Sequence, residues 1–303
     1  SYLNSYPAAA DNLSGSLSLN GKLSGELENP VFDFELDSTE LNFAELGIEI
    51  NDNSFSFKIN EELILVEKFN FAVDSGRYNL NGRIFDLSSE LKTELKLELL
   101  EVLSRELSLK YIDLYPLAAD LIFGGTVEFN SQGTAYQALV DISADSSGEP
   151  GNLSLSGTVD RNLDLDFEAS ELQLDFNSKQ YDFNLNLTSL LDFSGSIDGS
   201  LESPILRLEH QLRELSVNNN QLELVEGEIL LEGSRRFSVS ENINFRAGGE
   251  LTADGSYSLI DDQLNLSSNL RDLPLGFLIS FLGEEYSASG SINGAFRAEG
   301  NLA

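Results

Sequence analysis

Cysteine, methionine and tryptophan are all absent from this chain of 303 residues. Without cysteine there is no disulfide framework and no thiolate chemistry. Cysteine usage therefore does not indicate whether the protein works in an oxidising or a reducing compartment. The sequence has no run of about 18 apolar residues, and it therefore predicts no membrane-spanning helix. Its longest apolar candidate, Phe277–Leu282, is far too short.

Basic residues are scarce, with 18 Lys and Arg against 51 Asp and Glu and a formal net charge of −33. No basic patch can displace counterions from a phosphate backbone, so we expect no nucleic-acid partner. An anionic membrane surface is disfavoured for the same reason. The acidity fits a highly solvated exterior or adaptation to high salt, with an acidic patch for a basic partner as the alternative.

Signals for catalysis are equally sparse. The one histidine, His210, lies in a strand-like stretch, where we expect it to face solvent. No His and Asp cluster has the spacing of metal ligands, and there is no nucleophile elbow, P-loop or dinucleotide fingerprint. The polar run Asn51–Asn53 reads as an ordinary turn rather than a calcium loop. We therefore predict no enzyme activity, no metal and no cofactor.

Apolar residues recur at every second position over most of the chain, which is typical of β-strands. Polar, glycine-rich or asparagine-rich breaks separate these runs at short intervals. The pattern predicts an all-β antiparallel meander of about twenty strands. Residues 87–109 fit either a helix or strands, and we favour strands. The loop Ser143–Asn152 is the best candidate for a boundary or an insertion.

Three proline-containing segments interrupt the alternation and predict short helices. They are Ser5–Asp11, Asp113–Gly125 and Arg271–Gly283. Each would open one repeat, so we divide the chain into a repeat at 1–112, a second at 113–270 and the start of a truncated third at 271–303.

A strand motif also recurs, with the form Gly-x-apolar-x-Gly-x-apolar-x-x-Pro. It occupies 21–30 and 195–204, and a partial copy lies at 290–296. In an extended strand its glycines share the apolar face, where they permit tight curvature and leave room inside. These motif glycines are Gly21, Gly25, Gly195 and Gly199.

Strands with one apolar face can close as a sandwich with a packed core, as a barrel or as a curled sheet that forms a trough. The glycines and the uniform Leu, Ile and Phe filling favour the trough. We predict an elongated, U-shaped antiparallel β-sheet with an apolar groove, plus two or three short helices at the repeat starts. The residues predicted to line the groove are Leu17, Leu19, Leu23, Leu27, Phe32, Phe34, Leu36, Phe55, Phe57, Leu163, Leu165, Phe167, Phe193, Ile197, Leu201, Leu222 and Leu224.

The strand pattern at 19–30 and 193–204 resembles the repeats of the TamB family, the translocation and assembly module. So do the Asp-Leu-(Tyr)-Pro-Leu helix starts at 113–117 and 272–275. TamB belongs with the AsmA-like proteins and, more remotely, with the repeating β-groove lipid-transfer proteins. The likeness extends over essentially the whole chain and rests on the recurrence of a short motif.

The resemblance implies a taco-shaped β-sheet in the periplasm of a diderm bacterium, within a larger protein anchored in the inner membrane outside this segment. It implies movement of phospholipid between the two membranes, with acyl chains in the groove. It also implies a BamA-like outer-membrane barrel partner and a role in outer-membrane biogenesis. Two alternatives remain, a structural or adhesive β-rod with a dry core and a carbohydrate-active β-helix enzyme.

Overall fold

The structure is a computed structural model that describes residues 13–27, 29–43, 48–73, 76–87, 89–103, 121–148, 150–177, 186–217, 220–233, 235–280 and 288–301. In these residues the chain forms strands almost throughout, with one short helix, α3 (Leu275–Ser280). The strands are β1 (Leu13–Glu26), β2 (Asn29–Phe43), β3 (Ile48–Ile59), β4 (Leu63–Val73), β5 (Gly76–Phe85), β6 (Lys92–Leu103), β7 (Leu121–Gln132), β8 (Ala135–Ser146), β9 (Asn152–Val159), β10 (Asn162–Asn177), β11 (Asn186–Ser200), β12 (Ser203–Val217), β13 (Asn220–Glu232), β14 (Arg236–Phe245), β15 (Glu250–Ser258), β16 (Gln263–Pro274) and β17 (Ser291–Asn301).

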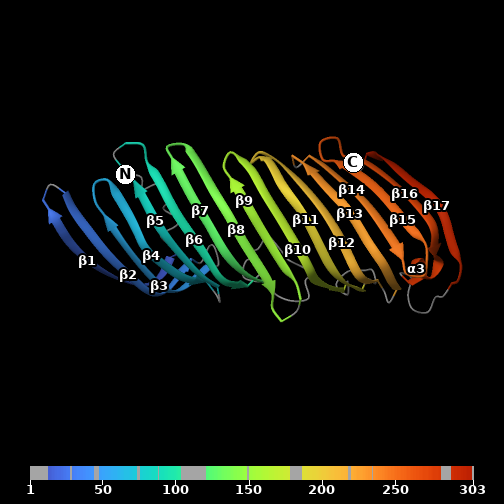
Figure 1. The fold of residues 1–303 in the computed structure, drawn as a ribbon, viewed down its shortest axis with the longest axis horizontal. Helices are drawn as coiled ribbons and strands as arrows, with labels where there is room; N and C mark the ends of the chain where they lie inside the picture. The colour runs from blue at the N-terminus through green and yellow to red at the C-terminus, as the bar shows by residue number, and fades with distance from the viewer. Residues whose placement is uncertain are drawn as a thin grey trace. The chain divides into compact units, whose positions relative to one another are not determined.

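The chain divides into two units. The first comprises Ser1–Ile112 and Ile122–Ser143, and the second comprises Asp113–Leu121 and Ala144–Ala303. Strands β1 to β7 of the first unit pair antiparallel in chain order. Strands β9 to β17 of the second do the same (Figure 1). The expected antiparallel all-β meander is therefore confirmed over the described strands.

The structure confirms some of the predicted helices and strands and contradicts others. Lys92–Leu103 is a strand, as favoured over a helix for this part of 87–109. The predicted helix at 271–283 is present only as α3, because residues up to Pro274 still belong to β16. The helix predicted at Asp113–Gly125 is wrong from Leu121 onward, since β7 begins there. Residues 1–12, with the first predicted helix, and 104–120 lie outside the described part.

β-Bulges interrupt several of the long strands, and a bulge bends the strand that carries it. Register breaks separate Leu99 from Val102, Ala169 from Leu172 and Leu270 from Leu273. An acidic residue with a left-handed backbone, φ between 50° and 58°, lies in each of these bulges and at the corresponding place in β12. These residues are Glu101, Glu171, Glu214 and Asp272.

A buried apolar side chain directly follows each of these acids. Val102 is 0% exposed, Leu172 3%, Leu215 4% and Leu273 1%. In the second unit, residues from both sides of the bulges pack into one cluster. Helix α3 packs against the same cluster through Phe277, whose ring centroid is 4.9 Å from that of Phe245.

Candidate functional site: the apolar face and its polar row

Apolar side chains of the second unit lie in register across neighbouring strands. Residues that pair directly on neighbouring strands form rows across the sheet. Because side chains alternate along each strand, every row lies on one face or the other. One row is apolar on every strand from β10 to β16: Leu165, Ile197, Leu206, Leu231, Phe237, Tyr257 and Leu264. At about 4.8 Å per strand, such a row extends for about 29 Å.

The opposite face is polar in the same strands. Three residues along each strand from the apolar row lies a row that consists of Glu168, Ser194, Glu209, Glu228, Ser240, Asp254 and Ser267. Charged side chains on this face are paired with a cation in places, such as Asp198 with Arg207 at 2.6 Å. These exposed pairs contribute little to stability, and the main effect of the row is to keep this face hydrated.

The first unit has an equivalent apolar face. Its row across β1 to β7 is Leu19, Leu36, Phe55, Phe69, Leu80, Leu97 and Val127. Aromatic rings form a chain of contacts on this face with centroid separations of 4.7–6.0 Å. The rings belong to Phe32, Phe34, Phe57, Phe55, Phe69, Phe71 and Tyr78. Offset aromatic contacts of this kind stabilise the face. Phe32, at the end of the series of rings, is 39% exposed to solvent.

Most of the residues predicted to line a groove lie within the strands of these two faces. The side chain of Leu17 lies outside the described part. Leu19 and Leu23 on β1 are 60% and 63% exposed. The half-buried members are Phe34, Leu36, Phe55, Phe57, Leu163, Leu165, Phe167, Phe193 and Ile197.

Three of the predicted lining residues are not where the sequence pattern places them: Leu27, Leu201 and Leu224. Leu27 and Leu201 lie in the turns after β1 and β11 and are strongly exposed. Leu222 and Leu224 face opposite sides, because a bulge intervenes and they pair with the consecutive residues Phe245 and Asn244. Leu222 is 5% exposed and belongs to the core cluster, whereas Leu224 lies on the polar face.

The motif glycines have two distinct roles. Gly21 pairs with Phe34 and Gly195 with Phe167, and the ring in each case occupies the space above the glycine. A Cβ at Gly195 would lie 2.6 Å from Cζ of Phe167. Gly25 and Gly199 instead have φ values of 92° and 93° at the strand ends. There they lead into the turns that return at the motif prolines, so these two serve turns rather than strand curvature.

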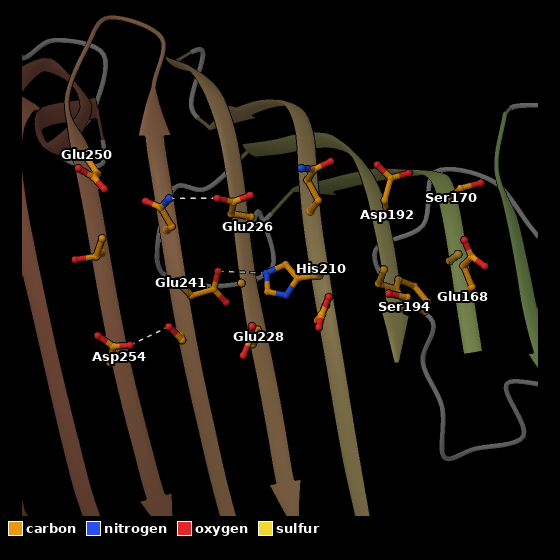
Figure 2. Close-up of a pocket in the computed structure, with 18 residues that line it drawn as sticks. Glu168, Ser170, Asp192, Ser194, His210, Glu226, Glu228, Glu241, Glu250 and Asp254 are labelled. Atoms are coloured by element: carbon orange, nitrogen blue, oxygen red, sulfur yellow. Dashed lines mark hydrogen bonds and ion pairs between the residues drawn. The ribbon is translucent and has the colours of Figure 1, made fainter. Parts of the chain in front are cut away.

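His210 does not face solvent. It alternates in phase with Leu206, Leu208 and Leu212 on the apolar face, and its side chain is only 12% exposed. Its Nε2 lies 3.2 Å from Oε2 of Glu241, which is on the apolar face of β14. Figure 2 shows the two side chains pointing toward each other across β13. The sequence signal that reveals them is the alternation itself, which gives both residues the phase of their apolar neighbours.

Gly227 makes this contact possible. It is the register partner of both His210 and Glu241, so all three occupy one row. A Cβ at Gly227 would lie 2.5 Å from Oε2 of Glu241. Burial raises the pKa of the Glu241 carboxyl above its ordinary value, against the opposing charge of His210. Nδ1 of His210 is buried and has no hydrogen-bond partner among the described residues.

A hollow of about 980 Å³ lies at the height of this row on β10 to β15. Its lining comes in runs of consecutive residues, such as 226–228 and 240–242, and most of the side chains are acidic or amide (Figure 2). Within the described residues, no group of three or more His, Asp or Glu is arranged to hold a metal ion. Most of its lining residues, such as Glu168, Glu226 and Asp254, belong to the polar face of the strands.

Comparison of the chain with protein families, with curated proteins and with solved structures finds no match. Among the helical residues that the structure describes, none form a segment long and apolar enough to cross a bilayer.

Proposed function

We propose that this chain binds and conducts phospholipid along the apolar face of its sheet, without catalysing a covalent reaction. In keeping with the resemblance of its motif to TamB, we place it in the periplasm of a diderm bacterium. There it would act in outer-membrane biogenesis with a BamA-like barrel partner, as part of a larger protein with an inner-membrane anchor.

The observation that carries the proposal is the unbroken apolar row from Leu165 to Leu264, whose members are half-buried or exposed instead of packed in a core. A phospholipid with two chains of about sixteen carbons exposes on the order of 25 kcal/mol of apolar surface in water, at about 0.8 kcal/mol per CH₂. Contact with such a face removes much of this cost. A uniform lining also lets the cargo slide, because no position binds it much more tightly than the next.

The bend of the strands supports the same function. In the proposed trough the bend would turn the apolar faces of the two arms toward each other, so acyl chains inside it would be shielded on both sides. In this arrangement the polar face would lie outside, where its Ser, Asp and Glu side chains would keep the sheet soluble. A dry core is the competing outcome, and the cluster at the bulges provides it only in part.

The test compares two substitutions on neighbouring positions of β14. Val239 lies on the apolar face and Ser238 on the polar face. We expect lipid mass spectrometry of organic extracts to find phospholipid with the purified natural chain and with Ser238→Asp. Val239→Asp should carry several-fold less, because a buried carboxylate disfavours acyl contact.

Circular dichroism of each protein checks that strand content is retained. A natural chain that purifies without lipid, also after incubation with vesicles, would contradict the proposal and favour a structural β-rod. Equal lipid content in the two variants would show that lipid binds somewhere other than the apolar face.

A further inference from the structure

One row of the apolar face breaks its pattern. Between Phe193 on β11 and Phe296 on β17, polar residues alternate with small ones on consecutive strands. The row reads His210, Gly227, Glu241, Ala253 and Ser268. The Glu241 carboxylate lies over Gly227 toward His210, so the low position beside Glu241 is Ala253, its register partner on β15. The row is a polar notch bounded by two aromatic rings.

Glu241 is the acceptor of this notch. Its side chain is 23% exposed, and Oε2 is the oxygen that contacts His210. No hydrogen bond to its Oε1 occurs among the described residues, so one carboxylate oxygen is available to a ligand. His210 is the other titratable side chain of the row, and its remaining nitrogen is buried. The Glu241 carboxylate is therefore the charged acceptor of the notch, and the Ser268 hydroxyl can donate or accept.

The charges around the notch favour a cationic group. Glu209, Glu226 and Glu228 lie on the adjoining positions of β12 and β13, on the opposite face. Arg213 and Arg207, the nearest arginines of β12, are engaged by Asp192 and Asp198. An anionic group would meet this field unfavourably, whereas an ammonium would form a charge-assisted hydrogen bond.

We propose that the notch of His210, Gly227, Glu241, Ala253 and Ser268 receives the primary ammonium of a phospholipid headgroup, with Glu241 as its hydrogen-bond acceptor. This inference rests on the proposed function, since it assumes that acyl chains occupy the neighbouring apolar rows. It adds a substrate class, namely phospholipids whose headgroup carries N–H donors. A quaternary ammonium has the same charge but donates no hydrogen bond, so it should be held less well.

The experiment uses vesicles of phosphatidylethanolamine, phosphatidylcholine and phosphatidylglycerol in equal amounts. The chain is incubated with them and re-isolated, and the bound lipids are quantified by mass spectrometry. We expect phosphatidylethanolamine to be enriched about tenfold over phosphatidylcholine, as for a hydrogen bond to a charged group. Glu241→Gln should bring the ratio close to that of the vesicles while the total bound lipid stays within twofold.

Two further variants keep the test sharp. Ala253→Leu fills the notch beside an intact carboxylate and should also abolish the enrichment, so the result does not depend on the folding of Glu241→Gln. Glu228→Gln removes a carboxylate of the polar face in the same part of the sheet and should leave the enrichment unchanged. Enrichment that is absent in the natural chain, or that persists in both Glu241→Gln and Ala253→Leu, overturns the ammonium site. Absence of any bound lipid instead overturns the proposed function itself, so the two failures are distinguishable.

Discussion

Asp192 on β11 accepts a hydrogen bond from the backbone N–H of Glu171, the left-handed residue in the bulge of β10, over 2.8 Å. Arg213 on β12 holds the same carboxylate with two bonds, of 2.6 and 3.0 Å. In the bulge of β16, Oδ1 of Asn293 likewise accepts a hydrogen bond from the backbone N–H of Asp272, at 2.7 Å. The bulges that bend the sheet are thus stabilised by side chains from neighbouring strands, which satisfy backbone donors that the sheet ladder leaves unpaired.

Asp192→Ala should destabilise the second unit by about 1–3 kcal/mol, because it leaves the N–H of Glu171 without its acceptor and removes two hydrogen bonds of Arg213. Chemical denaturation monitored by circular dichroism measures the change. Asp166→Ala is the control, since Asp166 is exposed on the same polar face and pairs in the ladder with Ser196. Its effect should stay within about 0.5 kcal/mol. Equal losses in the two variants would contradict a special role for Asp192.

The contribution of Asp192 should depend on pH. The hydrogen bond from Arg213 holds the pKa of this carboxyl below its ordinary value, and the N–H of Glu171 acts in the same direction. A lowered pKa in the folded state means that the stabilisation is present above the unfolded pKa and is lost as the pH falls through the folded pKa. Denaturation midpoints of the natural chain and Asp192→Ala should therefore converge between about pH 4 and pH 2. A constant difference over this range would argue against an ionised Asp192.

Glu241→Gln should show the opposite dependence. Burial raises the folded pKa of Glu241, so its contribution to stability is fully present below the unfolded pKa and is lost as the pH rises through the folded pKa. The variant has no such loss, and it should gain stability relative to the natural chain between pH 4 and pH 7. Thermal unfolding at the two pH values measures this. A relative loss of stability by the variant on raising the pH would show that His210 outweighs the burial.

Gly195 of the strand motif and Gly294 of its partial copy should respond differently to alanine. A Cβ at Gly195 would lie 2.1 Å from the carbonyl oxygen of Arg207, and backbone has little freedom to move away. At Gly294 on β17 no atom lies within 4 Å of the added Cβ. We expect Gly195→Ala to cost more than about 2 kcal/mol and Gly294→Ala to be neutral or mildly stabilising. Similar denaturation midpoints for both variants would show that β11 and β12 accommodate the methyl group.

Glu214 tests the backbone of the bulges separately from side-chain contacts. It has φ of 53° and an exposed side chain. Glu214→Val should destabilise by about 1–2 kcal/mol, because β-branched residues resist the left-handed region. Glu214→Gly should stay within about 1 kcal/mol of the natural chain, since relief of strain offsets the greater freedom of the unfolded chain. If valine is tolerated as well as glycine, the bend does not require this backbone conformation.

Much of the fold was predictable from alternation alone. Leu206, Leu208 and Leu212 share a phase, and the structure keeps them on one face of β12. His210 has the same phase, but because it is polar we predicted that it faces solvent. That prediction was wrong, since its side chain is only 12% exposed. Its partner Glu241 lies two strands away. Gly227 indicates their contact only once the register of the three strands is known.

Where the pattern failed, the reason is a shift of one residue. The bulge between Leu222 and Leu224 turns them to opposite faces, because the side-chain period of a strand is two. Leu201 continues the alternation of β11 in the sequence but lies in the turn, since the hairpin pairs Ser200 with Ser203. Neither event leaves a local mark that distinguishes it from a regular strand.

The sequence by itself determined that the chain is an antiparallel β-meander with one apolar and one polar face, because period-two alternation follows directly from strand geometry. Only the tertiary structure decided where the strands bend, which glycines serve a ring or a turn, and that a carboxylate and an imidazole meet within the apolar face. These features depend on the register between strands, and register is set by contacts between residues far apart in the chain.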